Sequence, residues 1–335
     1  MLSFLASSVP TPAIGDLSHN GPVSSLLGEG GNRLDWDRLP SRLKLAIEAQ
    51  AGSRVVAART HRGGFSPGLA ATLSLEEGGR VFVKAVSAAV NPESRSMHRR
   101  EALLAASLPR SLPAPRFLWA LEVGDWVALG FEAVSGHTPQ LPWLETDLNR
   151  VLAAIDHLSS ALTPAPIAAP PIAAYLADHF TGWRHLLAAG GHPLLDPWAA
   201  RNLGRLADLE LGWPAAAAGD TLVHGDLRAD NILLTADHVL FVDWPHACVG
   251  AAWIDLLLML PSVTMQGGPP PQSLFARSAV ASAAPGNAVE AVLAALSGYF
   301  IRGATLPAPP GLPNFRSFQR AQGEVAVEWL RGRIG

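Results

Sequence analysis

The sequence predicts a two-lobed α+β protein, in which a strand-rich first lobe is followed by a mainly helical second lobe. Short apolar runs typical of strands occur between residues 53 and 134, and one helical segment interrupts them. From about Trp143 onward, the apolar residues recur at helical spacing. One strand pair, within residues 221–244, lies among those helices. A chain of 335 residues is long enough for one large or two coupled domains.

The first lobe is expected to hold a mostly antiparallel sheet and one helix packed against it. A leading helix is predicted over 39–52, because Pro40 and Ser41 suit a helix start and Gly52 suits a stop. A second helix is predicted from Pro92 to Leu108. The strand candidates are "SRVVAAR", "LAATLSLEE", "RVFVKAV", "RFLWALEVG" and "DWVALGFEAV".

The second lobe is predicted from long helical patterns and from one hairpin with its turn at Thr235–His238. Each pattern is interpreted as one helix: "LETDLNRVLAAIDHLSSAL", "IAAYLADHFTGWRHLLAAG", "DPWAARNLGRLADLELGW" and the buried "ACVGAAWIDLLLMLPSV". Residues 1–35 are rich in Ser, Gly, Pro and Asn and are expected to form a loose arm. The predicted lobes are 36–134 and 135–335.

Composition excludes several classes of function. The net charge of -3 and the pI near 6.4 give no reason to expect a nucleic-acid partner. The single cysteine, Cys248, rules out an internal disulfide and fits a reducing cytosol. The longest apolar stretch carries Asp255 at its centre, which argues against a membrane span. The N-terminus does not read as a signal peptide, so a cytoplasmic location is expected.

The segment "LVHGDLRADNILL" carries the densest chemical signal. Asp226 follows one strand, Asn231 precedes the next, and Asp243 ends the strand after that. Phosphoryl transfer from a nucleotide needs a carboxylate beside the nucleophile and oxygen ligands for Mg²⁺. Asp226 would serve as the base, and Asn231 and Asp243 would hold the metal. Taken alone, each residue could simply cap a helix or a turn, but their joint occurrence between strands favours a site.

These motifs resemble those of the aminoglycoside phosphotransferase family, whose fold is that of the protein kinases. The first family signature stands here as His224-Gly225-Asp226 with Asn231. The second is carried by Val242-Asp243, Ala247, Gly250 and Asp255-Leu256, with Ala252 where proline is usual. The resemblance covers the chain from about Leu39 onward. It implies an ATP- and Mg²⁺-dependent phosphotransferase acting on a hydroxyl of a small molecule, with GTP as an open alternative.

Lys84 is one of only two lysines in a chain whose other cationic positions are arginine, and it lies in the apolar run "VFVKAV". The resemblance implies that Lys84 grips the α- and β-phosphates of the nucleotide and pairs with Glu101 on the following helix. A compact ammonium suits such a point contact better than the planar fork of arginine. The alternative is a lysine that extends to solvent from the edge of the sheet.

Two further nucleotide contacts are implied by position in the family outline. The loop of Gly63, Gly64, Phe65 and Ser66 precedes Lys84 and would bring backbone N–H groups to the phosphates. A plain hairpin turn is the alternative for this loop. The backbone around Glu132 and Val134, where the lobes would join, is the expected contact for the base.

Arg228 lies two residues beyond Asp226, where many protein kinases carry a lysine. The proposed role is to neutralise charge on the transferred phosphoryl group, and the alternative is an exposed surface arginine. His224 is expected to tie the loop to the Asp243 segment, and Asp255 to anchor that loop from a helix start.

The acceptor is the least determined feature. Acidic residues are no more frequent than arginines in the late helices, which argues modestly against a strongly cationic acceptor. Trp183 and Trp198 could line a pocket or pack between helices. Two narrower interpretations stay open: an antibiotic-inactivating kinase, and a kinase-like protein that binds a nucleotide without turnover. The sequence does not indicate an oligomeric state.

Overall fold

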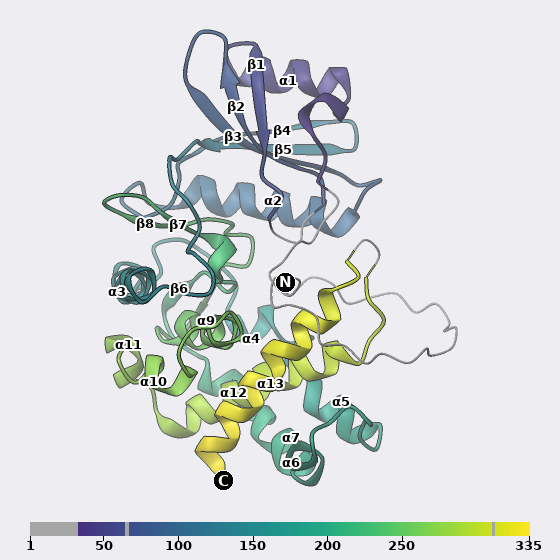
Figure 1. The fold of residues 1–335 in the computed structure, drawn as a ribbon, viewed down its shortest axis with the longest axis vertical. Coiled ribbons are helices and arrows are strands. Elements are labelled where there is room, and N and C mark those ends of the chain that lie inside the picture. Colours follow the sequence, from purple (N-terminus) through teal and green to yellow (C-terminus); the bar gives the residue numbers. More distant parts are fainter. Residues whose placement is uncertain (1–32, 64–66, 310–311) are drawn as a thin grey trace.

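The computed structural model describes residues 33–63, 67–309 and 312–335. Its elements form two parts stacked along the long axis of the molecule (Figure 1). The upper part holds a five-stranded sheet with two helices, and the lower part is mainly helical. The predicted two-lobed α+β architecture is therefore confirmed.

All five strands of the sheet pair antiparallel, in the order β1-β2-β3-β5-β4. The strands are β1 (Val55–Thr60), β2 (Leu69–Leu75), β3 (Arg80–Ser87), β4 (Phe117–Val123) and β5 (Trp126–Glu132). Strand β3 lies at the centre, where Lys84 pairs with Ala70 of β2 and Leu129 of β5. Five of the predicted strands are thus present at the predicted places.

The two faces of this sheet carry different cores because side chains alternate along each strand. On one face, Val81, Val83 and Ala85 pack with Leu43 and Ile47 of α1 (Ser41–Ala51). The opposite face, with Val86 and Leu129, is covered by α2 (Pro92–Ser107). Lys84 alternates with Val83 and Ala85, so its side chain belongs to the face that α2 covers.

Helix α2 begins as its sequence predicts. The Asn91 side chain accepts a hydrogen bond from the Ser94 backbone N–H at 2.7 Å, and Pro92 occupies the first helical position. His98, Glu101 and Leu104 recur at every third residue and are all buried. One helical stripe therefore presents a histidine and a carboxylate to the sheet.

The lower part is built around α12 and α13, which pack along each other (Figure 1). Its helices are α3 (Glu145–Ala161), α4 (Ile172–Tyr175), α5 (Gly182–Ala188), α6 (Pro197–Arg201), α7 (Leu203–Leu211), α8 (Trp213–Ala216), α9 (Ile254–Met265), α10 (Pro271–Phe275), α11 (Ala279–Ser282), α12 (Gly286–Ala304) and α13 (Phe315–Ile334). Gly298 lets α5 approach α12 closely, because a Cβ there would lie 2.7 Å from Trp183 Cδ1. None of the helices in the described ranges is long and apolar enough to cross a membrane.

Two of the single helices predicted for the lower part are wrong. The pattern at 172–190 is divided into α4 and α5, and the pattern at 196–213 is divided into α6, α7 and the start of α8. Asp196 explains the start of α6, since its carboxylate caps the backbone N–H of Trp198 at 2.9 Å. Apolar spacing continues across such breaks because every short helix buries its own face in the same core.

Four short strands complete the lower part. The hairpin of β7 (Ile232–Leu234) and β8 (Val239–Phe241) has the predicted turn between them. Strand β6 (Thr221–Val223) pairs with β9 (Cys248–Gly250), which the sequence analysis placed inside a buried helix. That prediction is wrong for 248–250, since the helix begins only at Ile254.

Candidate active site

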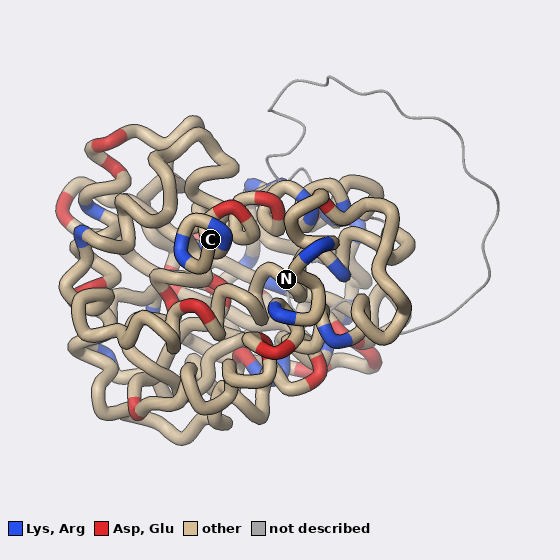
Figure 2. The backbone as a smooth tube through the Cα atoms, turned by 90° about the horizontal axis from the view of Figure 1, so that it is seen from below, with Lys and Arg blue, Asp and Glu red and all other residues tan. Residues whose placement is uncertain are grey.

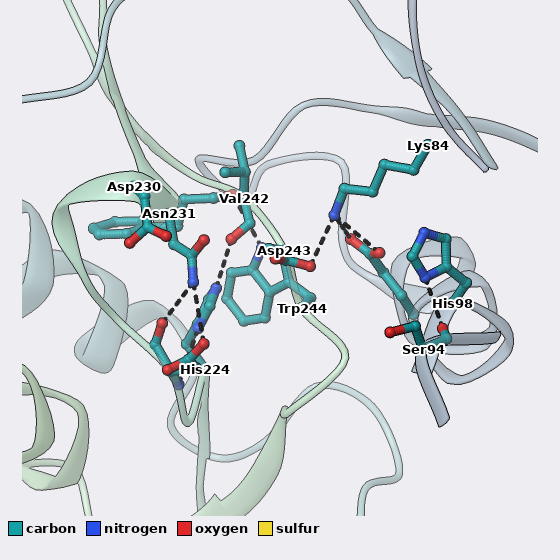
Figure 3. A network of polar contacts seen from close by, with 12 residues as sticks. Lys84, Ser94, His98, His224, Asp230, Asn231, Val242, Asp243 and Trp244 are labelled. Atoms are coloured by element: carbon teal, nitrogen blue, oxygen red, sulfur yellow. Dashed lines mark hydrogen bonds and ion pairs between the residues drawn. The ribbon is translucent and has the colours of Figure 1, made fainter. Parts of the chain in front are cut away.

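Lys84, Asn231 and Asp243 come from both parts of the molecule and lie near one another where the parts meet (Figure 3). His224 to Arg228 follow β6, a short 3-10 helix, η3 (Ala229–Asn231), leads into β7, and Asp243 follows β8. From the sheet part, Lys84 on β3 contacts Asp243, and Glu101 on α2 contacts Lys84. Strand ends therefore place the polar side chains, as the sequence predicted.

The loop that carries Asp226 is held by two buried side chains. The Asp255 carboxylate accepts hydrogen bonds from the His224 and Gly225 backbone N–H groups, at 2.7 and 2.8 Å. The His224 Nε2 lies 2.9 Å from the Val242 carbonyl oxygen, which ties the loop to the segment of Asp243. Gly225 adopts φ 80°, and a Cβ there would lie 2.7 Å from the His246 carbonyl oxygen. These contacts are the ones expected for His224 and Asp255.

Asp226 and Asn231 are linked directly. The Asn231 Nδ2 donates to the Asp226 carbonyl oxygen at 2.8 Å and approaches the Asp226 Oδ2 at 3.4 Å. Burial acts to raise the pKa of the Asp226 carboxyl, but Arg228 and other neighbouring positive charges together lower it below its ordinary value. Asp226 is therefore ionised at neutral pH and can accept a proton or a hydrogen bond.

Arg228 is buried, with 6% of its surface exposed, so the interpretation as an exposed surface arginine is wrong. Its Nε and Nη2 donate to the two carboxylate oxygens of Asp230, at 3.1 and 2.7 Å. The same Nε lies 4.0 Å from Asp226 Oδ1, and the guanidinium stands 6.0 Å from the ring centre of Phe318. Asp230 thus orients a fixed positive charge beside Asp226.

Asp243 has a left-handed backbone, with φ 70°, which non-glycine residues seldom adopt. Its Oδ1 accepts a hydrogen bond from Lys84 Nζ at 2.8 Å. Burial acts to raise the pKa of the Asp243 carboxyl, but the adjacent ammonium lowers it well below its ordinary value. Asp243 is therefore an ionised carboxylate held in a strained backbone conformation at the interface between the two parts.

Lys84 joins the two parts of the molecule. Its Nζ contacts Glu101 Oε1 and Oε2 at 2.8 and 3.0 Å, as well as Asp243. Burial acts to lower the pKa of Lys84, but the two carboxylates raise it above its ordinary value, so the ammonium stays charged. Burial raises the pKa of Glu101 to about 7, with Lys84 acting in the opposite direction. The interpretation of Lys84 as a solvent-directed edge lysine is wrong.

The donor set suits a hard cation that shares its ligands with a nucleotide. Asn231 uses its Nδ2 on Asp226, which leaves its Oδ1 as the amide acceptor, and Asp243 supplies a carboxylate. Across the described ranges, no group of three or more His, Cys, Asp or Glu side chains is arranged to hold a metal. Two oxygen donors without a complete protein cage fit Mg²⁺, which keeps waters and takes phosphate oxygens.

The other two predicted nucleotide contacts are the loop that begins at Gly63 and the backbone around Glu132 and Val134. Gly63 lies in the loop between β1 and β2, and its carbonyl oxygen accepts a hydrogen bond from Arg33 Nη2 at 2.7 Å. Gly64, Phe65 and Ser66 lie outside the described residues. Glu132 ends β5, and its N–H donates to the Arg116 carbonyl oxygen at 2.9 Å, so this N–H is already used. Val134 lies in the segment that leaves the sheet.

The loop after Asp243 is braced by Arg100, whose role no sequence pattern indicates. Arg100 Nε donates to the Pro245 carbonyl oxygen at 2.6 Å, and its Nη2 donates to the Ala247 carbonyl oxygen at 2.8 Å. The Tyr175 hydroxyl lies 2.9 Å from His246 Nδ1, and the Arg100 guanidinium stacks 4.5 Å above the Tyr175 ring centre. Burial lowers the pKa of His246 to about 3, so this histidine is neutral. Only the position of Arg100, beside Glu101 on the same helix, could have drawn attention to it.

Comparison with known proteins places this geometry in a family. The profile of the phosphotransferase enzyme family (APH) matches residues 60–293. No curated protein matches the chain.

Among solved structures, aminoglycoside phosphotransferase APH(4)-Ia is similar at TM-score 0.60 and 15% identity, over 88% of this chain and 99% of that one. Choline kinase LicA from Streptococcus pneumoniae is similar at TM-score 0.57 and 11% identity, over 87% of this chain and 100% of that one. Amicoumacin kinase hAmiN, solved with AMP-PNP, Ca²⁺ and Ami, is similar at TM-score 0.54 and 10% identity, over 87% and 95%. The kinase-like fold is thereby confirmed, and the family match covers more than half of the sequence. This chain belongs to the phosphotransferase enzyme family.

Proposed function

We propose that the protein transfers the γ-phosphate of ATP to a hydroxyl group of a small molecule, with Mg²⁺ bound at Asn231 and Asp243. The observation that carries the proposal is the Lys84 ammonium, which contacts Glu101 and Asp243 at 2.8 Å across the interface of the two parts. A non-catalytic relative could lose one or more of the polar residues that phosphoryl transfer needs. Here Lys84, Glu101, Asp226, Asn231 and Asp243 are all present, and hydrogen bonds join Lys84 to Glu101 and Asp243 and join Asn231 to Asp226.

The nucleotide would lie between the two parts. Lys84 would bind the α- and β-phosphates, while Gly63 to Ser66 would cover them and the backbone around Glu132 and Val134 would face the base. Structures of family relatives support nucleotide use: a thermostable variant of APH(4)-Ia was solved with ADP and hygromycin B, and hAmiN with AMP-PNP and Ca²⁺. GTP would fill the same phosphate site.

The transfer step assigns one role to each side chain near the acceptor. Asp226 orients the acceptor hydroxyl and takes its proton as the new O–P bond forms and the bond to the β-phosphate oxygen breaks. Arg228 lies beside Asp226 and neutralises negative charge on the phosphoryl group. When bound, Mg²⁺ neutralises charge on the β- and γ-phosphates.

The acceptor is expected to carry little positive charge. Acidic side chains of the last two helices are already paired with arginines, in the pairs Glu290–Arg333, Glu324–Arg320 and Glu328–Arg331. Basic and acidic residues are interspersed along the backbone (Figure 2). This distribution gives no reason to expect a nucleic-acid partner. Trp183 packs between helices, since it is fully buried and its Nε1 donates to Ser297 Oγ. A neutral or weakly charged hydroxyl compound fits these features better than a polycationic antibiotic.

The test is Mg²⁺-dependent ADP release over a panel of aminoglycosides, other hydroxylated antibiotics, amino alcohols and sugars. Asp226→Asn is run beside the wild type, with Asp237→Asn in the exposed hairpin turn as the matched control. The proposal requires an acceptor whose turnover is kept by Asp237→Asn and lost by Asp226→Asn. Binding of MgATP without turnover of any acceptor would favour a nucleotide-binding protein instead.

A further inference from the structure

Arg33 lies beside this site although it precedes the residues that the family profile matches. The backbone at Arg33 forms a parallel bridge with Gly68, and the Leu34 N–H donates to the Gly68 carbonyl oxygen at 3.0 Å. Trp36 and Leu39 follow directly and are buried in the core under the sheet. The segment that carries Arg33 is therefore fixed against the end of the β1–β2 loop.

The guanidinium of Arg33 has few hydrogen-bond partners for a partly buried cation. Its Nη2 donates to the Gly63 carbonyl oxygen at 2.7 Å. Its Nε is buried and has no hydrogen-bond partner among the residues that the structure describes. Among the described residues, no carboxylate lies within ion-pair distance of it. A guanidinium has five N–H donors, and a buried charged donor without a partner is costly, so a ligand that supplies oxygens would be favoured.

The surroundings of Arg33 indicate which ligand this is. Burial lowers the pKa of Arg33, while the negative charges of Asp243 and Asp230 act to raise it. Each of these carboxylates already has a cation of its own, because Asp243 binds Lys84 and Asp230 binds Arg228. The bond of Arg33 to the Gly63 carbonyl oxygen places its guanidinium at the loop that is proposed to cover the phosphates, and both carboxylates are already paired with other cations.

We propose that Arg33 binds phosphate oxygens of the nucleotide, closing the phosphate site from the segment ahead of the sheet. The inference rests on the proposed function, since it assumes that a nucleotide lies beside Lys84. The planar fork of arginine matches two phosphate oxygens at once, whereas Lys84 supplies a point charge. The nucleotide would then be held by a lysine from β3 on one side and by an arginine from outside the matched region on the other.

The experiment is calorimetric titration of the full chain with MgATP, MgADP and adenosine, in wild type and three variants. Arg33→Gln keeps an N–H donor for the Gly63 carbonyl oxygen and removes the charge, and Arg33→Lys restores a charge without the fork. The matched control is Arg62→Ala in the β1–β2 loop that Arg33 contacts, because the Arg62 side chain is 72% exposed and paired with Asp35. Thermal unfolding of each variant shows whether it folds.

For Arg33→Gln, we expect MgATP and MgADP to bind at least about tenfold more weakly and adenosine to bind within about twofold of wild type. Arg33→Lys should recover part of the loss, and Arg62→Ala should bind all three ligands like wild type. An equal loss for adenosine and MgATP would overturn the inference, because it would show that Arg33 only holds the loop. Unchanged MgATP binding would overturn it too, while leaving the proposed function intact. Failure of the wild type to bind MgATP would overturn both, and the two failures are thus distinguishable.

Discussion

The two charged clusters of the site are built in opposite ways. Asp226, Arg228, Asp230 and Asn231 lie within six residues of one another, and one loop and one 3-10 helix hold them. Lys84, Glu101 and Asp243 come from a strand, a helix and a distant loop, and Lys84 is 159 residues from Asp243 along the chain. The cluster of Asp226 is positioned by the short chain segment that contains all its members. The cluster of Lys84 forms only when the sheet part and the helical part come together. We therefore expect substitutions in the first to change chemistry and substitutions in the second to change nucleotide binding.

The largest effect should come from Asp226→Asn, which tests the local cluster. Removal of the base should lower turnover by about 10³-fold or more, within the range found for general bases. MgATP binding should stay within about threefold of wild type, because Asp226 belongs to the acceptor side. Steady-state kinetics with the acceptor found in the panel, together with calorimetry, measure the two quantities. Turnover near that of wild type would remove Asp226 from the mechanism.

Lys84→Arg should have the next largest effect and should act chiefly on the nucleotide. The ammonium fits between two carboxylates at 2.8 Å, and a planar guanidinium is too large for that place. We expect kcat/KM for ATP to fall about 100-fold, since the two cations differ in shape as well as in hydrogen-bond geometry. Lys44→Arg is the matched control, because Lys44 is the only other lysine and lies in α1. Equal activity of the two variants would show that the position requires only charge.

The same contrast explains how much could be predicted from the sequence. Strand and helix patterns placed Lys84 on a strand and Glu101 on the next helix, and the short spacing from Asp226 to Asn231 fixed the local cluster. The hydrogen bonds of Arg100 to the loop after Asp243 could not be foreseen. They join residues that are separated by 145 and 147 positions along the chain, and no sequence motif links the two segments. The divided helices were missed for a related reason. Apolar spacing reports the face that is buried and does not report where a cap such as Asp196 begins a new helix.

Glu101→Gln should be milder than Lys84→Arg, because Asp243 still holds the ammonium. We expect kcat/KM for ATP to fall about tenfold at pH 8.5, as one of two charged partners is lost. The difference should shrink toward pH 6. Burial raises the pKa of Glu101 to about 7, so below that pH the wild-type side chain also takes up a proton and becomes neutral like glutamine. A ratio of wild type to variant that stayed constant from pH 6 to 8.5 would contradict this account.

Arg228→Ala should have the smallest effect on rate near pH 8, about fivefold, because Asp226 would stay ionised there. Its clearer signature is the pH profile. Arg228 lowers the pKa of Asp226, and the base works only when deprotonated, so activity is lost as the pH falls through that pKa. Without the guanidinium, the pKa of Asp226 rises, and the acidic limb of kcat/KM for the acceptor should move to higher pH. Asp230→Asn, which removes the partner that orients Arg228, should move the limb less than Arg228→Ala does. If Arg228→Ala lowered the rate equally at every pH, Arg228 would act on the phosphoryl group alone, and its proximity to Asp226 would have no consequence for the base.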